Sequence, residues 1–252
     1  MESRPRIMAP FAIDMQQPVA HQLATALWSR TLTKAAYLHW VHVPHFFAKA
    51  PRYPRLFLNP VVEALTIVTW WVVPLFWVPV ILFMFAASIP DLSTSTAMAM
   101  CVLGLLKWSF LEYVLHRFVF HMDDAMPDHP LALALHFALH GIHHKFPTDP
   151  YRLVFPPAVA SVLCIIVTSL SYVLWTPLLP LTSHFWCMMA AFIAGYVAYD
   201  MCHYSHHLGN IRILAPMQRY HNAHHCSRGK GEKYGVSTPA WDYVFGTRTP
   251  TE

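Results

Sequence analysis

The chain is 252 residues long; 56% of its residues are hydrophobic and only 12% are charged. An ordinary soluble domain carries about 25% charged residues, so this composition indicates a protein that works in a membrane. The formal net charge of +4 comes without a dense basic patch, which argues against nucleic acid as a partner.

Four apolar segments approach or exceed the length of about 20 residues that a helix needs to cross the hydrocarbon core. They cover residues 61–87, 96–115, 153–179 and 183–201. Pro74 and Pro79 predict a kink in the first segment. The second contains Lys107 and Glu112, and charged side chains at membrane depth usually face the interior of the protein. We therefore expect an all-α integral membrane protein with about four transmembrane helices.

The basic residues divide cleanly between the two sides that these spans define. Seven precede the first span, three lie between the second and third, and six follow the fourth, whereas residues 88–95 and 180–182 contain none. By the positive-inside tendency, both termini and residues 116–152 face the cytosol. We expect residues 1–60 to form a cytosolic N-terminal arm, and residues 61–252 to form the membrane domain with a helical cap on its cytosolic side.

Fourteen of the eighteen histidines lie in the stretch 116–225, and ten of them form four clusters. The clusters are His116 with His121, His140 with His143 and His144, His203 with His207, and His221 with His224 and His225. Positions i, i+3 and i+4 share one face of an α-helix, so we expect each HxxHH cluster to converge, as well as the HxxxH pair. The first pair is five residues apart, which requires a helix end or a local unwinding between its members.

All ten imidazoles lie on the cytosolic side of the predicted spans, so they can meet in one place. Imidazole selects zinc, copper, iron or nickel rather than magnesium or calcium. A structural zinc ion takes four ligands, often including cysteine, and the five cysteines here form no CxxC pair. Ten histidines therefore indicate two metal ions that handle dioxygen. The other eight histidines are interpreted as packing or capping residues; His136, four residues before His140, is the nearest exception.

The sequence around these clusters resembles the fatty acid hydroxylase superfamily of membrane di-iron enzymes, and within it the fatty acid 2-hydroxylases. The resemblance runs from about Tyr37 to Arg248, and it includes Tyr37-Leu-His-Trp-Val-His42, His140-Gly-Ile-His-His-Lys-Phe-Pro-Thr-Asp-Pro-Tyr-Arg-Leu-Val-Phe-Pro-Pro157 and Tyr234-Gly-Val-Ser-Thr-Pro-Ala-Trp-Asp-Tyr-Val-Phe-Gly246. The HxxHH clusters are shared with membrane desaturases and sterol oxidases, whereas the stretches between them are more specific. The family pattern falls on all ten clustered histidines.

The resemblance implies a di-iron centre that inserts one oxygen atom at C2 of long or very-long acyl chains, including those of ceramides and other sphingolipids. It also implies residence in the endoplasmic reticulum membrane and electrons from cytochrome b5 and its reductase. About 60 residues precede the first span, so we expect the short form, without a fused cytochrome b5 domain and with a separate donor protein. Zinc can replace iron in isolated material, because it binds imidazole more strongly.

Polar residues near the third cluster are candidates for the catalytic apparatus. Asp200 lies three residues before His203 and is expected to orient a ligand imidazole through its second ring nitrogen. Tyr196 lies one turn earlier, and we expect both to line the substrate entrance; interfacial hydrogen bonding is the alternative role. Lys145 and Arg152 are expected near the headgroup of the substrate.

Two other kinds of function stay open on the sequence. A sterol oxidase, desaturase or carotenoid hydroxylase of the same superfamily would share the clusters, and residues 234–246 argue against it. A membrane metal carrier would need ligands spread along the spans, whereas all ten histidines gather at one face. Dioxygen consumption coupled to a reductant separates an enzyme from a carrier, and a lipid product profile separates the enzymes from one another.

Overall fold

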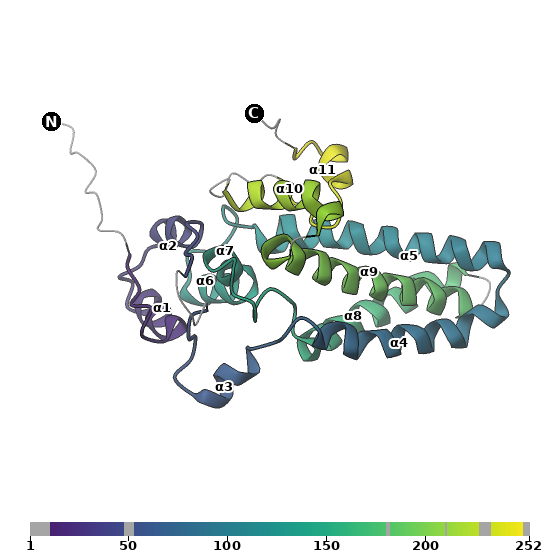
Figure 1. Ribbon diagram of the computed structural model, residues 1–252, viewed down its shortest axis with the longest axis horizontal. Helices are drawn as coiled ribbons and strands as arrows, with labels where there is room; N and C mark the ends of the chain where they lie inside the picture. The colour runs from purple at the N-terminus through teal and green to yellow at the C-terminus, as the bar shows by residue number, and fades with distance from the viewer. Residues whose placement is uncertain (1–10, 48–52, 180–181, 210, 227–232, 249–252) are drawn as a thin grey trace.

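The computed structural model describes residues 11–47, 53–179, 182–209, 211–226 and 233–248, and every regular element within them is helical (Figure 1). The long helices are α4 (Val72–Ser88), α5 (Thr94–Leu115), α8 (Pro157–Trp175) and α9 (Thr182–Leu208). The shorter ones are α1 (Val19–Trp28), α2 (Lys34–Val41), α3 (Pro60–Leu65), α6 (Pro130–His136), α7 (Ile142–Lys145), α10 (Ala215–Cys226) and α11 (Ala240–Val244). Two π turns, η2 (His116–Phe120) and η3 (Phe137–Gly141), and three 3₁₀ turns, η1 (Ile89–Asp91), η4 (Thr176–Leu178) and η5 (Arg212–Leu214), complete the order.

Four helical segments are long and apolar enough to cross a membrane. They are Val72–Asp91, Thr94–Phe120, Pro157–Leu178 and Thr182–Leu208. They form an elongated bundle on one side of the molecule, and α1, α2, α6 and α7 gather beyond one end of it as a cap (Figure 1). The prediction of an all-α, multi-pass membrane protein with four spans is confirmed, and the exposed apolar side chains of the bundle form its lipid-facing surface.

The first span begins at Val72 rather than at residue 61. Asn59 accepts a hydrogen bond from the backbone N–H of Val61 (2.9 Å), so it caps the separate short helix α3. Pro74 then falls in the first turn of α4, where proline is tolerated, and Pro79 lies inside the helix. One proline rather than two is therefore left to bend this span.

The third and fourth spans also end at other residues than predicted. The third begins at Pro157 rather than at residue 153, because proline has no N–H to lose in the first turn of a helix. The fourth continues to Leu208, beyond the predicted end at residue 201. His203 and His207 therefore lie on the last turns of a membrane-spanning helix rather than just past it.

Helix α9 is the buried centre of the bundle, with α4 and α5 packed against it. The approach of α5 is close, because a Cβ on Gly104 would lie 2.2 Å from the carbonyl oxygen of Met188. Gly195 likewise leaves room for the indole of Trp108, which a Cβ would approach to 2.9 Å. Helix α8 is more peripheral, and Ala160 is its one buried residue.

The two charged residues within the second span face the interior, as predicted. The carboxylate of Glu112 accepts hydrogen bonds from the backbone N–H groups of Val236 and Ser237 (both 2.8 Å) and from the Ser237 hydroxyl (2.6 Å). The ammonium of Lys107 lies over the ring of Trp175, 5.0 Å from its centroid. The span thereby anchors the segment before α11.

The cap has a hydrophobic core of its own, to which the N-terminal segment contributes. Val19, Leu23 and Leu27 of α1 pack with Leu133 and Phe137 from α6 and η3. Residues 19–41 are thus part of the cap that carries His140, His143 and His144. The domain boundary at residue 60 stays a prediction.

Candidate metal centre

A π turn brings together the two histidines that ordinary helical spacing would separate. In η2, the backbone N–H of His121 donates to the carbonyl of His116 at 3.1 Å, which is the i→i+5 bond of a π turn. The two imidazoles therefore lie on one face, through the local unwinding that their spacing required. The second π turn, η3, carries His140 and leads directly into α7 with His143 and His144.

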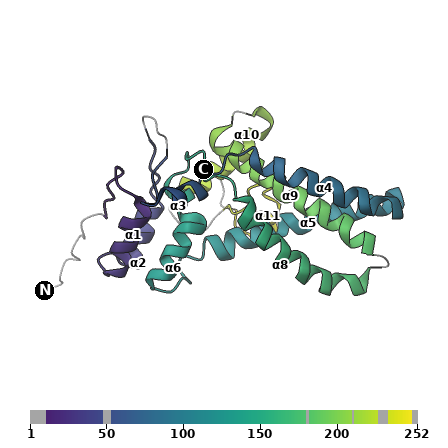
Figure 2. The same ribbon diagram turned by 90° about the horizontal axis from the view of Figure 1, so that it is seen from below.

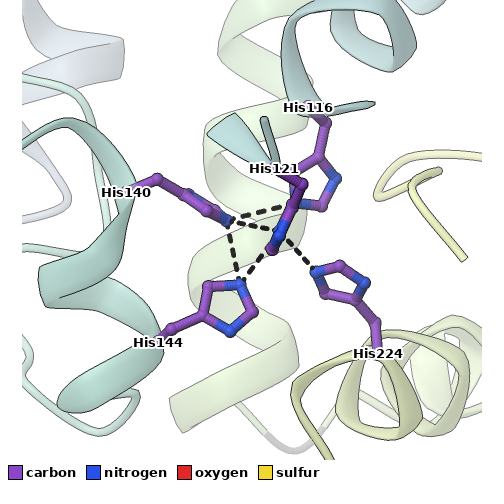
Figure 3. A group of neighbouring side chains, drawn as sticks. All are labelled: His116, His121, His140, His144 and His224. Carbon is purple, nitrogen blue, oxygen red and sulfur yellow. Dashed lines mark hydrogen bonds between the residues drawn. The ribbon is translucent and has the colours of Figure 1, made fainter. Parts of the chain in front are cut away.

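The ten clustered histidines form two groups of five, in each of which the candidate ligand atoms all lie within 4.8 Å of one another. The first group is His116, His121, His140, His144 and His224; the second group is His143, His203, His207, His221 and His225. Figure 3 shows the rings of the first group pointing toward one point from separate segments. Contacts between Nε2 atoms are 2.9–3.3 Å in the first group and 2.9–3.1 Å in the second.

Each HxxHH cluster is divided between the two groups, which corrects the expected convergence on one point. His140 and His144 belong to the first group, but His143 belongs to the second. On α10, His224 joins the first group while the other two histidines of its cluster join the second. Successive residues are about 100° apart around a helix, so adjacent histidines reach different points. The segment from η3 to α7 and helix α10 therefore each supply ligands to both groups.

The spacing of the nitrogens fits a metal ion in each group. Ligands about 2.1 Å from an ion and at right angles to one another lie about 3.0 Å apart, as the Nε2 atoms do. Among the described residues, neither group contains a cysteine or a carboxylate. An all-imidazole set suits zinc, copper, iron or nickel.

The environment of the rings favours the protonation state that binds metal. Burial lowers the pKa of His140, His143 and His144 well below its ordinary value, and neighbouring imidazoles lower it further. The same two causes lower the pKa of His221 and His225. Neutral imidazole is the form that coordinates a metal ion, so these histidines are in the metal-binding form near neutral pH.

Backbone carbonyls orient one ring in each group. Nδ1–H of His116 donates to the carbonyl of Tyr234 at 2.5 Å, and Nδ1–H of His203 donates to the carbonyl of Leu153 at 2.9 Å. Each bond fixes the tautomer that leaves Nε2 as the ligand atom. Asp242 in turn accepts a hydrogen bond from the backbone N–H of Tyr234 at 2.9 Å, so it holds the first of these carbonyls in place.

Asp200 and Tyr196 act on the loop before α8 rather than on an imidazole. The Asp200 carboxylate accepts a hydrogen bond from the backbone N–H of Phe155 at 3.2 Å, and the Tyr196 hydroxyl donates to the carbonyl of the same residue at 3.4 Å. We expected Asp200 to bond a ligand ring directly, and the structure shows an indirect link instead. Asp200 holds the loop before α8, and the carbonyl of Leu153 in the same loop orients the ring of His203. A catalytic role for either residue stays a prediction.

Sequence reasoning missed a buried network behind the first group. The carboxylate of Asp123 lies 2.7 Å from Nε2 of His42 and 3.2 Å from Nε2 of His136, and Nδ1 of His136 lies 2.7 Å from the Tyr37 hydroxyl. The His42 ring stacks on that of His121 with a centroid distance of 6.2 Å. His136 thus belongs to this network rather than to either group. The sequence did contain an indication of this network, because residues 37–42 are one of the stretches that resemble the family.

The two cations that were expected near a headgroup are committed to internal partners. The Lys145 ammonium donates to two backbone carbonyls of the N-terminal segment at 2.8 and 3.0 Å. The Arg152 guanidinium pairs with the carboxylates of Asp149 (2.7 Å) and Glu63 (2.8 Å). Arg152 is therefore already neutralised by carboxylates, whereas Lys145 is held by backbone carbonyls of the cap.

An apolar cavity of about 230 Å³ runs from the histidines into the bundle between α5, α8 and α9. Its inner end is lined by His140 of the first group and by His143 and His203 of the second, and Asp200 and Tyr196 also line it. Farther along the bundle its wall includes Phe192, which at 1.5 Å per residue lies about 16 Å along α9 from His203. The cavity is therefore long enough for part of a hydrocarbon chain with one end beside both groups.

Comparison with known proteins decides the family. The fatty acid hydroxylase profile matches residues 101–247, which include all ten histidines and the walls of the cavity. The chain belongs to the fatty acid hydroxylase family. The resemblance found in the sequence is thereby confirmed.

Individual relatives of this family agree over nearly the whole chain. The ceramide very long chain fatty acid hydroxylase scs7 of Schizosaccharomyces pombe is 35% identical over 94% of this chain and 66% of its own length. The fatty acid 2-hydroxylase of Mus musculus is 36% identical over 95% of this chain and 65% of its own length. The dihydroceramide fatty acyl 2-hydroxylase FAH1 of Arabidopsis thaliana is 33% identical over 96% and 95%. The chain thus spans about two thirds of the length of the yeast and mouse relatives and nearly all of the plant one.

A solved structure has the same fold. It is described as full-length scs7p with only the hydroxylase domain visible, and it superposes with a TM-score of 0.84 and 34% sequence identity. The match covers 95% of this chain and 86% of the other. The arrangement of the four spans and the cap is therefore shared with this relative.

Proposed function

We propose that this chain is a fatty acid 2-hydroxylase, which inserts one oxygen atom from dioxygen at C2 of long or very-long acyl chains. The observation that carries the proposal is the apolar cavity whose inner end is lined by His140 of the first group and His143 of the second. An acyl chain in this cavity has only its first carbons beside both groups, which suits oxidation next to the headgroup. Relatives named fatty acid 2-hydroxylase and dihydroceramide fatty acyl 2-hydroxylase support the same reaction.

Two iron ions are the proposed cofactors, one for each group of five histidines. The residues proposed to hold them are His116, His121, His140, His144 and His224 for the first, and His143, His203, His207, His221 and His225 for the second. Iron bound there would supply the oxygen-activating chemistry that cleavage of a strong C–H bond requires. Zinc is expected to be able to occupy the same groups in isolated protein, because it binds imidazole more strongly than ferrous iron does.

The chain's own residues hold the ligands and keep water away from the reacting carbon. Asp200 and Tyr196 are proposed to line the path of the substrate and to position His203 through the loop that contains Leu153. The apolar walls from α5, α8 and α9 exclude water from the acyl chain. This proposal makes Asp200 and Tyr196 positioning residues for the metal centre.

An uncharged acyl amide, as in a ceramide, is the proposed form of the substrate. A free fatty acid would bring a carboxylate to the inner end of the cavity, and burying a charge without a partner is costly. Arg152 is the cation that lines the cavity in the part of the chain described, and it is already paired with Asp149 and Glu63. The buried carboxyl groups of Glu112 and Asp200 also line this space and offer no positive charge to a further anion.

Cytochrome b5 and its reductase are the proposed electron source, and the endoplasmic reticulum membrane is the proposed location. The cap end of the bundle carries the histidine groups, and the basic residues concentrate in the segments at this end. By the positive-inside tendency this end faces the cytosol, where a separate cytochrome b5 and its reductase can reach it. All ten candidate ligands lie at one end of the bundle. This favours an enzyme over a metal carrier, which needs ligands along a path through the membrane.

Expression in a host that lacks 2-hydroxy lipids tests the proposed function. Cells that make this chain are expected to accumulate ceramides with a 2-hydroxy acyl chain, detected by lipid mass spectrometry. The variant His224→Ala, at equal expression, is the control and should yield none. A new double bond or an oxidised sterol as the product would instead point to another branch of the superfamily.

A further inference from the structure

Helix α6 and the π turn η3 expose apolar side chains along one face. Leu131, Leu135 and Leu139 follow one another at four-residue intervals and are 52%, 53% and 46% exposed. The opposite face is also apolar, with Leu133 and Phe137 buried in the core of the cap. A cap helix surrounded by water would carry polar side chains on its outer face, so this exposed leucine stripe is unlike a solvent-facing surface.

The leucine stripe continues the lipid-facing surface of the bundle. The turn η2 follows α5 directly and packs against η3, and it exposes Phe118 (58%) and Val119 (39%). On α8, Val159 and Leu163 are both 47% exposed. Figure 2 shows α6 lying across the direction of the long helices, on the same side of the molecule as α8. Apolar surface therefore extends from the spans through η2 onto α6.

The cavity reaches the surface on this same side. Helix α8 is loosely packed against all of its neighbours among the described residues, α5 included, so the wall of the cavity between α5 and α8 is thin. Leu139 of the stripe and Leu163 of α8 both line the cavity, and both are about half exposed. These two leucines therefore belong to the cavity and to the outer surface at once.

We propose that α6 and η3 lie in the leaflet of the bilayer on the cap side, and that Leu139 and Leu163 border a lateral mouth of the cavity. Lipid acyl chains, rather than a second protein, cover the leucine stripe, because the stripe is continuous with the lipid-facing surface of the spans. A segment that lies in the interfacial plane buries its apolar face among the headgroups and upper acyl chains. The substrate then passes sideways from the bilayer to the metal centre without crossing water. This last step rests on the proposed function, whereas the lipid contact of α6 does not.

Photolabelling by a lipid tests the contact directly. The protein is reconstituted into phosphatidylcholine vesicles that contain a trace of phosphatidylcholine with a diazirine in its acyl chain, and adducts are mapped by peptide mass spectrometry. Adducts are expected on the peptide with Leu131 and Leu135 as well as on the spans. Helix α1, a cap helix with the exposed Trp28, is the internal control. Labelling of α6 no stronger than that of α1 would overturn the proposal.

A charge in the leucine stripe tests the entry route. Leu135 does not line the cavity, so Leu135→Glu is expected to raise the KM for a ceramide embedded in vesicles several-fold and to leave kcat and metal content unchanged. Thr25→Glu on the exposed face of α1 is the matched control, and Leu135→Phe should behave as the unsubstituted chain. An unchanged KM for Leu135→Glu would refute lateral entry. Absence of hydroxylation by every form would refute the proposed function and leave the photolabelling result standing.

Discussion

At the scale of single residues, the assignment of each histidine to one of two groups is the most specific feature of the site. His143 and His144 are neighbours in sequence, yet their Nε2 atoms lie in different groups. Helical spacing predicted that these residues share a face. It did not predict that the two residues belong to different groups. Their side chains point about 100° apart around the helix, and which group each one joins depends on the histidines that other helices place beside it.

Single alanine substitutions separate the two groups. His144→Ala removes a ligand from the first group and His143→Ala removes one from the second, so each variant is expected to lose one of two ions and all hydroxylase activity. Elemental analysis gives the ion count, and cobalt substitution gives a different absorption spectrum for each remaining group. His39→Ala, at an exposed position outside both groups, should keep two ions. If both ligand variants lose both ions, the groups are not independent.

The network behind the first group predicts a selective effect on metal affinity. Asp123→Asn weakens the hold on His42, whose ring stacks on His121. Loss of a hydrogen bond to a ligand itself typically costs about 10–100-fold in metal affinity, and we expect a smaller loss for the ion of the first group, because Asp123 acts through His42. Competition with a chelator measures it. Asp128→Asn, at a largely exposed carboxylate, is the control; equal weakening of both ions by Asp123→Asn would contradict the role.

At the scale of helices, hydropathy and length predicted the existence of all four spans but not all of their ends. The errors arose where local hydrogen bonding overrides composition, as at Asn59, which caps a separate helix inside an apolar stretch. The π turn at His116 was foreseen only as a break in the helix. The spacing shows that His116 and His121, five positions apart, must share a face, but it does not show how the backbone achieves this.

Close packing of α5 on α9 gives a prediction for stability. Gly104→Ala places a Cβ 2.2 Å from the carbonyl oxygen of Met188, so the two helices must separate. Overpacking of this kind typically costs about 1–3 kcal/mol, and a lower midpoint of thermal unfolding in detergent is expected. Ala99→Leu on the exposed face of α5 should leave the midpoint unchanged. An equal midpoint for Gly104→Ala would show that the helices are less tightly packed than described.

At the scale of the whole molecule, the sequence predicted a cap with a metal centre but not which segments build it. The contact between His42 and Asp123 joins residues 81 positions apart, and no local pattern encodes such a pairing. The same holds for the Tyr234 carbonyl, which binds His116 across 118 residues. His42, from the segment expected as a cytosolic N-terminal arm, thus stacks on a ring of the first group.

The orientation of the molecule follows from the distribution of basic residues about the four spans. We expect the cap and both termini to face the cytosol. A tag at Met1 and another at Glu252 should both be digested by protease added outside sealed microsomes, while a lumenal marker protein stays intact. Protection of either tag would contradict the topology with four spans.

The origin of the oxygen atom in the product is the sharpest test of the proposed hydroxylation at C2. The purified chain is supplied with cytochrome b5, its reductase and a ceramide with an unhydroxylated acyl chain, under isotopically labelled dioxygen. We predict a hydroxyl at C2 of the acyl chain that carries one labelled oxygen atom, and no product when the donor is left out. Label that arrives from water instead, or a hydroxyl at another carbon, would contradict it.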